Sequence, residues 1–142
     1  MTLLLNSLIM VLLSSSAPQA NGSIEGTFRG TSICIQRHTA CNDEHVVYYI
    51  ARIGPDSAGV TPFRVTANKI INGIEEDMGV VSPCRFTHKT SSLYCPMPPT
   101  VRPGDWRFIL TNDRIDGGLW VPGGARLRNV HVVRDHPSAK PK

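Results

Sequence analysis

From residue 27 onward, the chain alternates between short β-type runs and clusters of turn-forming residues. The runs are rich in β-branched and aromatic residues, and several alternate between apolar and polar positions, as strands with one buried face do. No stretch longer than about ten residues after residue 20 shows helical periodicity. The expected strands span residues 27–35, 44–53, 61–71, 74–86, 93–95, 105–111, 114–121 and 125–134. This pattern predicts an all-β protein.

The turn signals between these runs are short. Asn72-Gly73 is the strongest two-residue hairpin signal, and Pro83 inside the fourth run indicates a bulge, an edge or a break. Successive strands joined in this way favour an antiparallel up-and-down meander of about eight strands, and closure into a barrel would remove its two open edges. The alternative is a two-sheet sandwich, which would tend to need longer crossovers than the chain offers outside residues 96–104.

The first twenty residues contain no charged side chain. Apolar residues 3–5 and 8–13 precede small residues 14–17, which is the layout of a secretory signal peptide. No Lys or Arg precedes the apolar run, Asn6-Ser7 interrupts it, and the cleavage point stays open; a buried N-terminal helix is the alternative. We expect a signal peptide at residues 1–20, one β-barrel domain at 21–135, a disordered tail at 136–142, and a secreted or periplasmic protein. No uncharged apolar run reaches the roughly 20 residues of a membrane-spanning helix.

Four cysteines in an exported chain predict two disulfide bonds. Three pairings are possible in principle. Sequence separation favours Cys34–Cys41 and Cys84–Cys95, because each pair brackets a turn-rich segment between β-type runs. Each bond would close a short loop and stabilise the fold by about 2–4 kcal/mol.

A metal site is the rival interpretation of the first pair. Cys34, His38, Cys41 and His45 form a C-x3-H-x2-C-x3-H pattern with four potential zinc ligands. The spacing matches no common zinc finger, and oxidised sulfurs cannot serve as thiolate ligands. We therefore expect no metal and no cofactor.

The start of the first strand carries a family resemblance. Gly26-Thr27-Phe28 resembles the G-x-W signature that opens lipocalin-type and related calycin barrels, with Phe in place of Trp. In that superfamily an Arg near the last strand packs across the aromatic ring and closes the end of the barrel, so the resemblance implies this role for Arg126 or Arg128 against Phe28. The wider pattern (GTFRGTS, CNDEHVVYYI, NGIEEDMG, DWRFIL) is similar to small secreted bacterial proteins with no assigned activity.

No catalytic motif stands out. The five histidines lack a neighbouring nucleophile motif such as G-x-S-x-G. Glu75, Glu76 and Asp77 are adjacent, and adjacent strand residues point to opposite faces, so they do not form an acid–base pair. The chain has no phosphate-binding loop and no dinucleotide fingerprint. We expect no enzymatic activity.

A basic surface is the next candidate. Arg126, Arg128 and Arg134 share one face of the last expected strand, an arrangement that can attract a polyanion. The formal charge of +4 is nevertheless ordinary for a soluble domain, and no aromatic residues interleave with these arginines as a nucleic-acid platform requires. We expect no nucleic-acid partner.

Two functions from different classes remain. In the first, the barrel carries a small apolar ligand; the same side chains can instead fill the interior as a core. In the second, the barrel is a solid protein-interaction module that resembles the small periplasmic barrel inhibitors of proteases, with residues 21–25 extended into a partner's cleft. A cavity of several hundred Å³ favours the carrier. We expect a monomer in either case. The expected ligand-lining residues are Tyr48 or Tyr49, Phe63, Met78, Trp106, Phe108 and Leu119.

Overall fold

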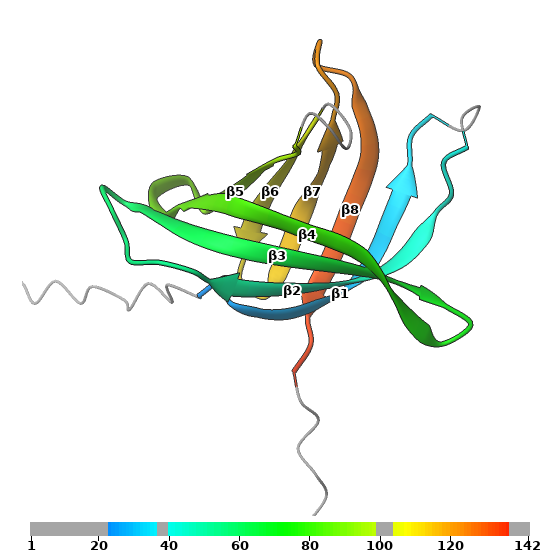
Figure 1. Cartoon of the computed structure of the whole chain (residues 1–142), viewed down its shortest axis with the longest axis horizontal. Coiled ribbons are helices and arrows are strands. Elements are labelled where there is room, and N and C mark those ends of the chain that lie inside the picture. The colour runs from blue at the N-terminus through cyan, green and yellow to red at the C-terminus, as the bar shows by residue number, and fades with distance from the viewer. Residues whose placement is uncertain (1–22, 37–39, 99–103, 137–142) are drawn as a thin grey trace, which may run out of the picture.

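Among the residues that the structure describes, the fold consists of eight β-strands and one short 3-10 helix (Figure 1). The computed structural model describes residues 23–36, 40–98 and 104–136. The predicted signal peptide, and the predicted tail beyond His136, lie outside these residues. The elements are β1 (Gly26–Cys34), β2 (Glu44–Arg52), β3 (Val60–Ile71), β4 (Ile74–Thr87), the 3-10 helix His88–Thr90, β5 (Ser92–Pro96), β6 (Asp105–Thr111), β7 (Arg114–Trp120) and β8 (Arg126–Arg134).

The strands form a closed antiparallel meander. Each strand pairs with the next along the chain, and β8 returns to pair with β1, so that Phe28 lies opposite Arg134 and Cys34 lies opposite Arg128. Within the described ranges no helix is long and apolar enough to cross a membrane. The all-β, up-and-down barrel predicted from the sequence is confirmed.

Local sequence explains where strands begin and end. The β3–β4 hairpin turns at Asn72 and Gly73, whose φ angles of 52° and 79° lie in the left-handed region that these two residue types tolerate. In β8, alternate residues point inward, so Val130 and Val132 are buried while His131 between them is exposed. Both predicted disulfides are present, Cys34–Cys41 and Cys84–Cys95.

The core occupies the barrel axis. Phe28 and Val46 are completely buried, and Phe63 meets Phe86 edge to face with ring centroids 6.2 Å apart. One glycine is required by this packing: a Cβ on Gly117 would lie 2.6 Å from Cδ1 of Phe108, so only glycine lets the Phe108 ring rest on β7.

The wall is weakest between β4 and β5. These strands pair over only three residues each, Arg85–Thr87 with Ser92–Tyr94, and they diverge from there (Figure 1). Pro83 and Pro96 lie at the point of divergence, and neither has an N–H to continue the ladder. The Cys84–Cys95 disulfide joins the two strands immediately before this point.

The strand β4 is also irregular along its pairing with β3. Register shifts occur opposite Phe63–Val65 and opposite Ala67–Asn68, where β4 carries an extra residue each time. These are β-bulges, which bend a strand and redirect its side chains. The first bulge contains Pro83, so a bulge is the one of the three expected alternatives at this proline that occurs. In Figure 1 the tip of the long β3–β4 hairpin projects beyond the barrel wall.

Candidate functional site

The divergence of β4 from β5 leaves a cavity in the barrel. Its volume is about 390 Å³, which lies within the range of small-ligand sites. The walls come from β1 to β8, and most of the lining side chains are apolar. The apolar residues that line it are Val65, Ala67, Met78, Val80, Val81, Met97, Pro98, Trp106, Phe108 and Leu119.

Aromatic side chains form one wall of the cavity. Trp106 and Phe108 are two residues apart on β6, so they share its inner face. Their rings are stacked with centroids 5.9 Å apart and planes 6° apart. Tyr48 meets Phe108 edge to face at 6.0 Å. The three rings present a continuous apolar surface to whatever occupies the cavity.

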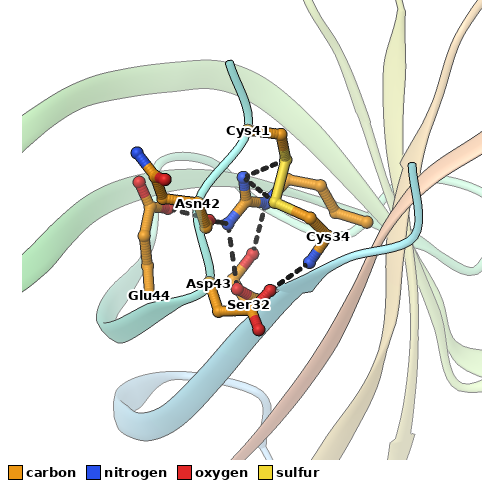
Figure 2. Close-up of polar contacts among 7 residues, drawn as sticks. Ser32, Cys34, Cys41, Asn42, Asp43 and Glu44 are labelled. Atoms are coloured by element: carbon orange, nitrogen blue, oxygen red, sulfur yellow. Dashed lines mark hydrogen bonds and ion pairs between the residues drawn. A yellow bond between two sulfur atoms is a disulfide. The ribbon is translucent and has the colours of Figure 1, made fainter. Parts of the chain in front are cut away.

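The polar side of the cavity is organised by Arg128. Its guanidinium donates from Nε to Ser32 Oγ at 2.8 Å, and from Nη2 to Ser32 O at 2.9 Å and Asn42 O at 2.8 Å. The Glu44 carboxylate accepts from Nη2 at 3.0 Å and forms an ion pair with it. Figure 2 shows these acceptors gathered around the Cys34–Cys41 disulfide. The charge of Arg128 is thus matched inside the protein.

The disulfide belongs to the same cluster. Nη1 of Arg128 lies 3.4 Å from Cys34 Sγ and 3.1 Å from Cys41 Sγ. The Asp43 carboxylate accepts from the Cys34 N–H at 2.8 Å (Figure 2). The disulfide-linked connection between β1 and β2 therefore contacts the guanidinium through both sulfurs, the Asn42 carbonyl and the Glu44 carboxylate. It is a rigid polar border for an otherwise apolar cavity.

Tyr48 reaches the cavity from β2. The residue is 4% exposed, and its hydroxyl makes no hydrogen bond with any described residue. Burial raises the pKa of this phenol well above its ordinary value, with the positive Arg128 opposing the change and Glu44 reinforcing it. As in an ordinary tyrosine, the hydroxyl keeps its proton at physiological pH and can donate a hydrogen bond.

The structure brings together most of the residues predicted to line a ligand. Tyr48, Trp106, Phe108 and Leu119 surround the cavity, and Met78 lies at its rim with 41% of its surface exposed. Phe63 does not join them, because it points to a hollow at the opposite end of the barrel. Tyr49, the alternative to Tyr48, is on the outer face.

Sequence reasoning missed the polar members of the site, Ser32 and Glu44, and gave Arg128 another role. The sequence did contain a signal for Arg128. Val130 and Val132 are the inward-facing residues of β8, and Arg128, two residues before Val130, belongs to the same face of the strand.

The predicted barrel closure is corrected by the structure. Arg134, rather than Arg126 or Arg128, lies over the Phe28 ring, 4.6 Å from its centroid. Arg126 lies instead over Trp120 at 4.6 Å. The reason is register: Phe28 and Arg134 are opposite each other on β1 and β8, whereas Arg128 is at the other end of the barrel. The cation–π contact itself occurs as the resemblance implied.

Arg134 also fixes the segment that precedes β1. Its guanidinium donates to Ser23 O and Glu25 O, both at 2.5 Å, and its Nε pairs with Asp113 at 2.7 Å. Ile24 between the two carbonyls is 1% exposed. Residues 23–25 are therefore packed against the barrel, and this part of the predicted inhibitor segment is not free to enter a partner's cleft.

A second hollow, of about 410 Å³, lies at this closed end. Two of its lining residues, Asp56 and His88, meet at the buried hydroxyl of Thr61, which bonds to Asp56 and lies 2.6 Å from His88 Nε2. The hydrogen bond from Thr61 lowers the pKa of Asp56. A hydroxyl between an imidazole and a carboxylate suggests a nucleophile, but Thr61 has no exposed surface, so a substrate cannot reach it. The cluster is a structural one that ties β3 to the loop after β4.

Comparison with known proteins adds no family to this description. No protein-family model matches the chain, and a search of curated proteins finds no significant match.

Proposed function

We propose that this protein is a secreted or periplasmic carrier that binds a small apolar ligand in the cavity bordered by Arg128. The observation that carries the proposal is the cavity itself: about 390 Å³ of space, lined mainly by apolar side chains, in a barrel that could otherwise have been filled. The lipocalin-like features of the sequence support it, because calycin barrels hold ligands in their interiors. The cavity is built from one chain, so a monomer suffices.

The driving force would be removal of apolar surface from water. Each 100 Å² of ligand surface buried contributes about 2.5 kcal/mol before the costs of association are subtracted. The stacked Trp106–Phe108 pair is suited to a planar ligand, which can lie parallel to these rings. The gap between β4 and β5 offers a lateral path for the ligand, since few backbone hydrogen bonds close it.

The proposal also includes export from the cytosol and a role without catalysis. Two disulfides support an oxidising compartment. A non-catalytic role is supported by the inaccessible Thr61 hydroxyl at the closed end and by the internal neutralisation of Arg128 at the open end.

Titration with N-phenyl-1-naphthylamine tests the carrier proposal, because the fluorescence of this neutral apolar probe rises and shifts to the blue in apolar surroundings. We expect saturable binding of one probe per chain. Ala67→Phe places a ring in the cavity from β3 and should weaken binding by about tenfold or more. Thr66→Phe is the matched control, because the neighbouring side chain points to the other face of the same strand. Absence of binding, or equal binding by both variants, would overturn the proposal.

A further inference from the structure

One polar group that lines the cavity makes no hydrogen bond within the part of the chain that the structure describes. The Tyr48 hydroxyl lies in the wall of the cavity, on a residue that is 4% exposed, and it makes no hydrogen bond with any described residue. The hydroxyl opens into the cavity rather than into packed protein, because Asn68 Oδ1 is the only fully buried side-chain polar atom without a partner among the described residues. A ligand oxygen is the natural partner for a hydroxyl in this position.

The neighbouring charges limit what that ligand can be. Arg128 would attract a carboxylate if it were alone, but Glu44 already forms an ion pair with it, and Nε and Nη2 are both committed to acceptors within the protein. The side chains of Arg128 and Glu44 are only 13% and 27% exposed. A second carboxylate in this position would meet Glu44 without a free cation to offset the repulsion.

Resting on the carrier function proposed above, we infer that the ligand is an uncharged, planar, mainly apolar molecule with a carbonyl oxygen that accepts a hydrogen bond from the Tyr48 hydroxyl. Tyr48 then selects for the oxygen, and the Arg128–Glu44 pair selects against acids.

Three probes of nearly the same shape test the inference: 2-acetylnaphthalene, 2-ethylnaphthalene and 2-naphthoate, each measured by displacement of N-phenyl-1-naphthylamine. We expect the ketone to bind about 3–10-fold more tightly than the hydrocarbon, as a single neutral hydrogen bond allows. The carboxylate should bind at least about tenfold more weakly than the ketone. Equal affinities for the ketone and the hydrocarbon, or tightest binding of the carboxylate, would overturn the inference.

Two variants and one control variant assign the selectivity to its residues. Tyr48→Phe should reduce the ratio of ketone to hydrocarbon affinity to about one while leaving the hydrocarbon's affinity unchanged. Tyr94→Phe, which removes a hydroxyl outside the cavity, should preserve the ratio. Glu44→Gln frees the charge of Arg128 and should strengthen naphthoate binding by about tenfold. If Tyr48→Phe keeps the ratio, or Glu44→Gln leaves naphthoate weak, the assignment is wrong.

The outcomes separate this inference from the proposal beneath it. If N-phenyl-1-naphthylamine does not bind, the carrier function itself fails. If it binds but the three naphthalene probes displace it equally well, the carrier function stands and the role of Tyr48 is rejected.

Discussion

Replacement of Arg128 by methionine should destabilise the protein far more than the same replacement of Arg126. Methionine preserves much of the buried stem of Arg128 but removes a guanidinium bonded to Ser32, Asn42 and Glu44. Breaking one partner of a fully buried pair costs about 3–5 kcal/mol. The 27% exposure of Glu44 reduces this figure, so we expect a loss of about 2–4 kcal/mol in the free energy of unfolding.

Arg126 is the matched control on the same strand. It is exposed, lies over Trp120, and donates to the Gly117 carbonyl. Contacts of this kind at an exposed site contribute about 1 kcal/mol or less. Arg128→Met should therefore lower the Tm by about 8–16 °C for a domain of this size, and Arg126→Met by about 4 °C or less.

Thermal and urea denaturation measure both effects, and a double variant identifies their cause. If an orphaned Glu44 carboxylate accounts for part of the loss, Arg128→Met combined with Glu44→Gln should be about 1 kcal/mol more stable than Arg128→Met alone. Equal Tm values for the two arginine variants would refute the reasoning that the Arg128 cluster holds the open end of the barrel together.

Three further predictions concern stability. Cys84→Ser with Cys95→Ser should cost about 2–4 kcal/mol and speed amide exchange at the β4–β5 pairing, which mass spectrometry can detect; unchanged exchange would contradict the role of this bond at the gap. Hydrogen bonds from Arg134 and from Tyr49 lower the pKa values of Asp113 and Glu75, so their stabilising contributions are present above about pH 4 and are lost as the pH falls through the lowered values; a Tm that stays constant down to pH 2 would contradict this. Gly117→Val forces a side chain into Phe108 and the β6 backbone and should cost about 2 kcal/mol or more, measured by urea denaturation against Ala51→Val, which adds the same side chain at an exposed position of β2; an equal cost for both would show that the space around Gly117 is not restricted.

The strands were predictable because their signals are local. Alternation marks each run, and turn residues such as Asn72-Gly73 mark its end, so each observed bound differs from the expected one by at most one residue. The disulfide pairing followed from the same logic, since cysteines on either side of one turn are close in any antiparallel meander. These features need no knowledge of distant parts of the chain.

The arrangement around the barrel was less predictable because it depends on register between distant strands. Phe63 and Tyr48 both point inward, but the pairing of β2 with β3 places them at different levels along the axis. The pairing of β1 with β8 decides that Arg134 meets Phe28 while Arg128 meets the Cys34–Cys41 bond. The sequence shows which residues face inward, and closure of the barrel decides which of them meet.

The most direct measurement of the central claim uses the two tryptophans of the chain. Trp106 lines the cavity, whereas Trp120 lies outside it beneath Arg126. In a ¹H–¹⁵N NMR titration with N-phenyl-1-naphthylamine, the carrier account predicts that the indole signal of Trp106 shifts and saturates while that of Trp120 stays in place. A saturable shift of Trp120 alone, or no shift of either signal, would contradict it.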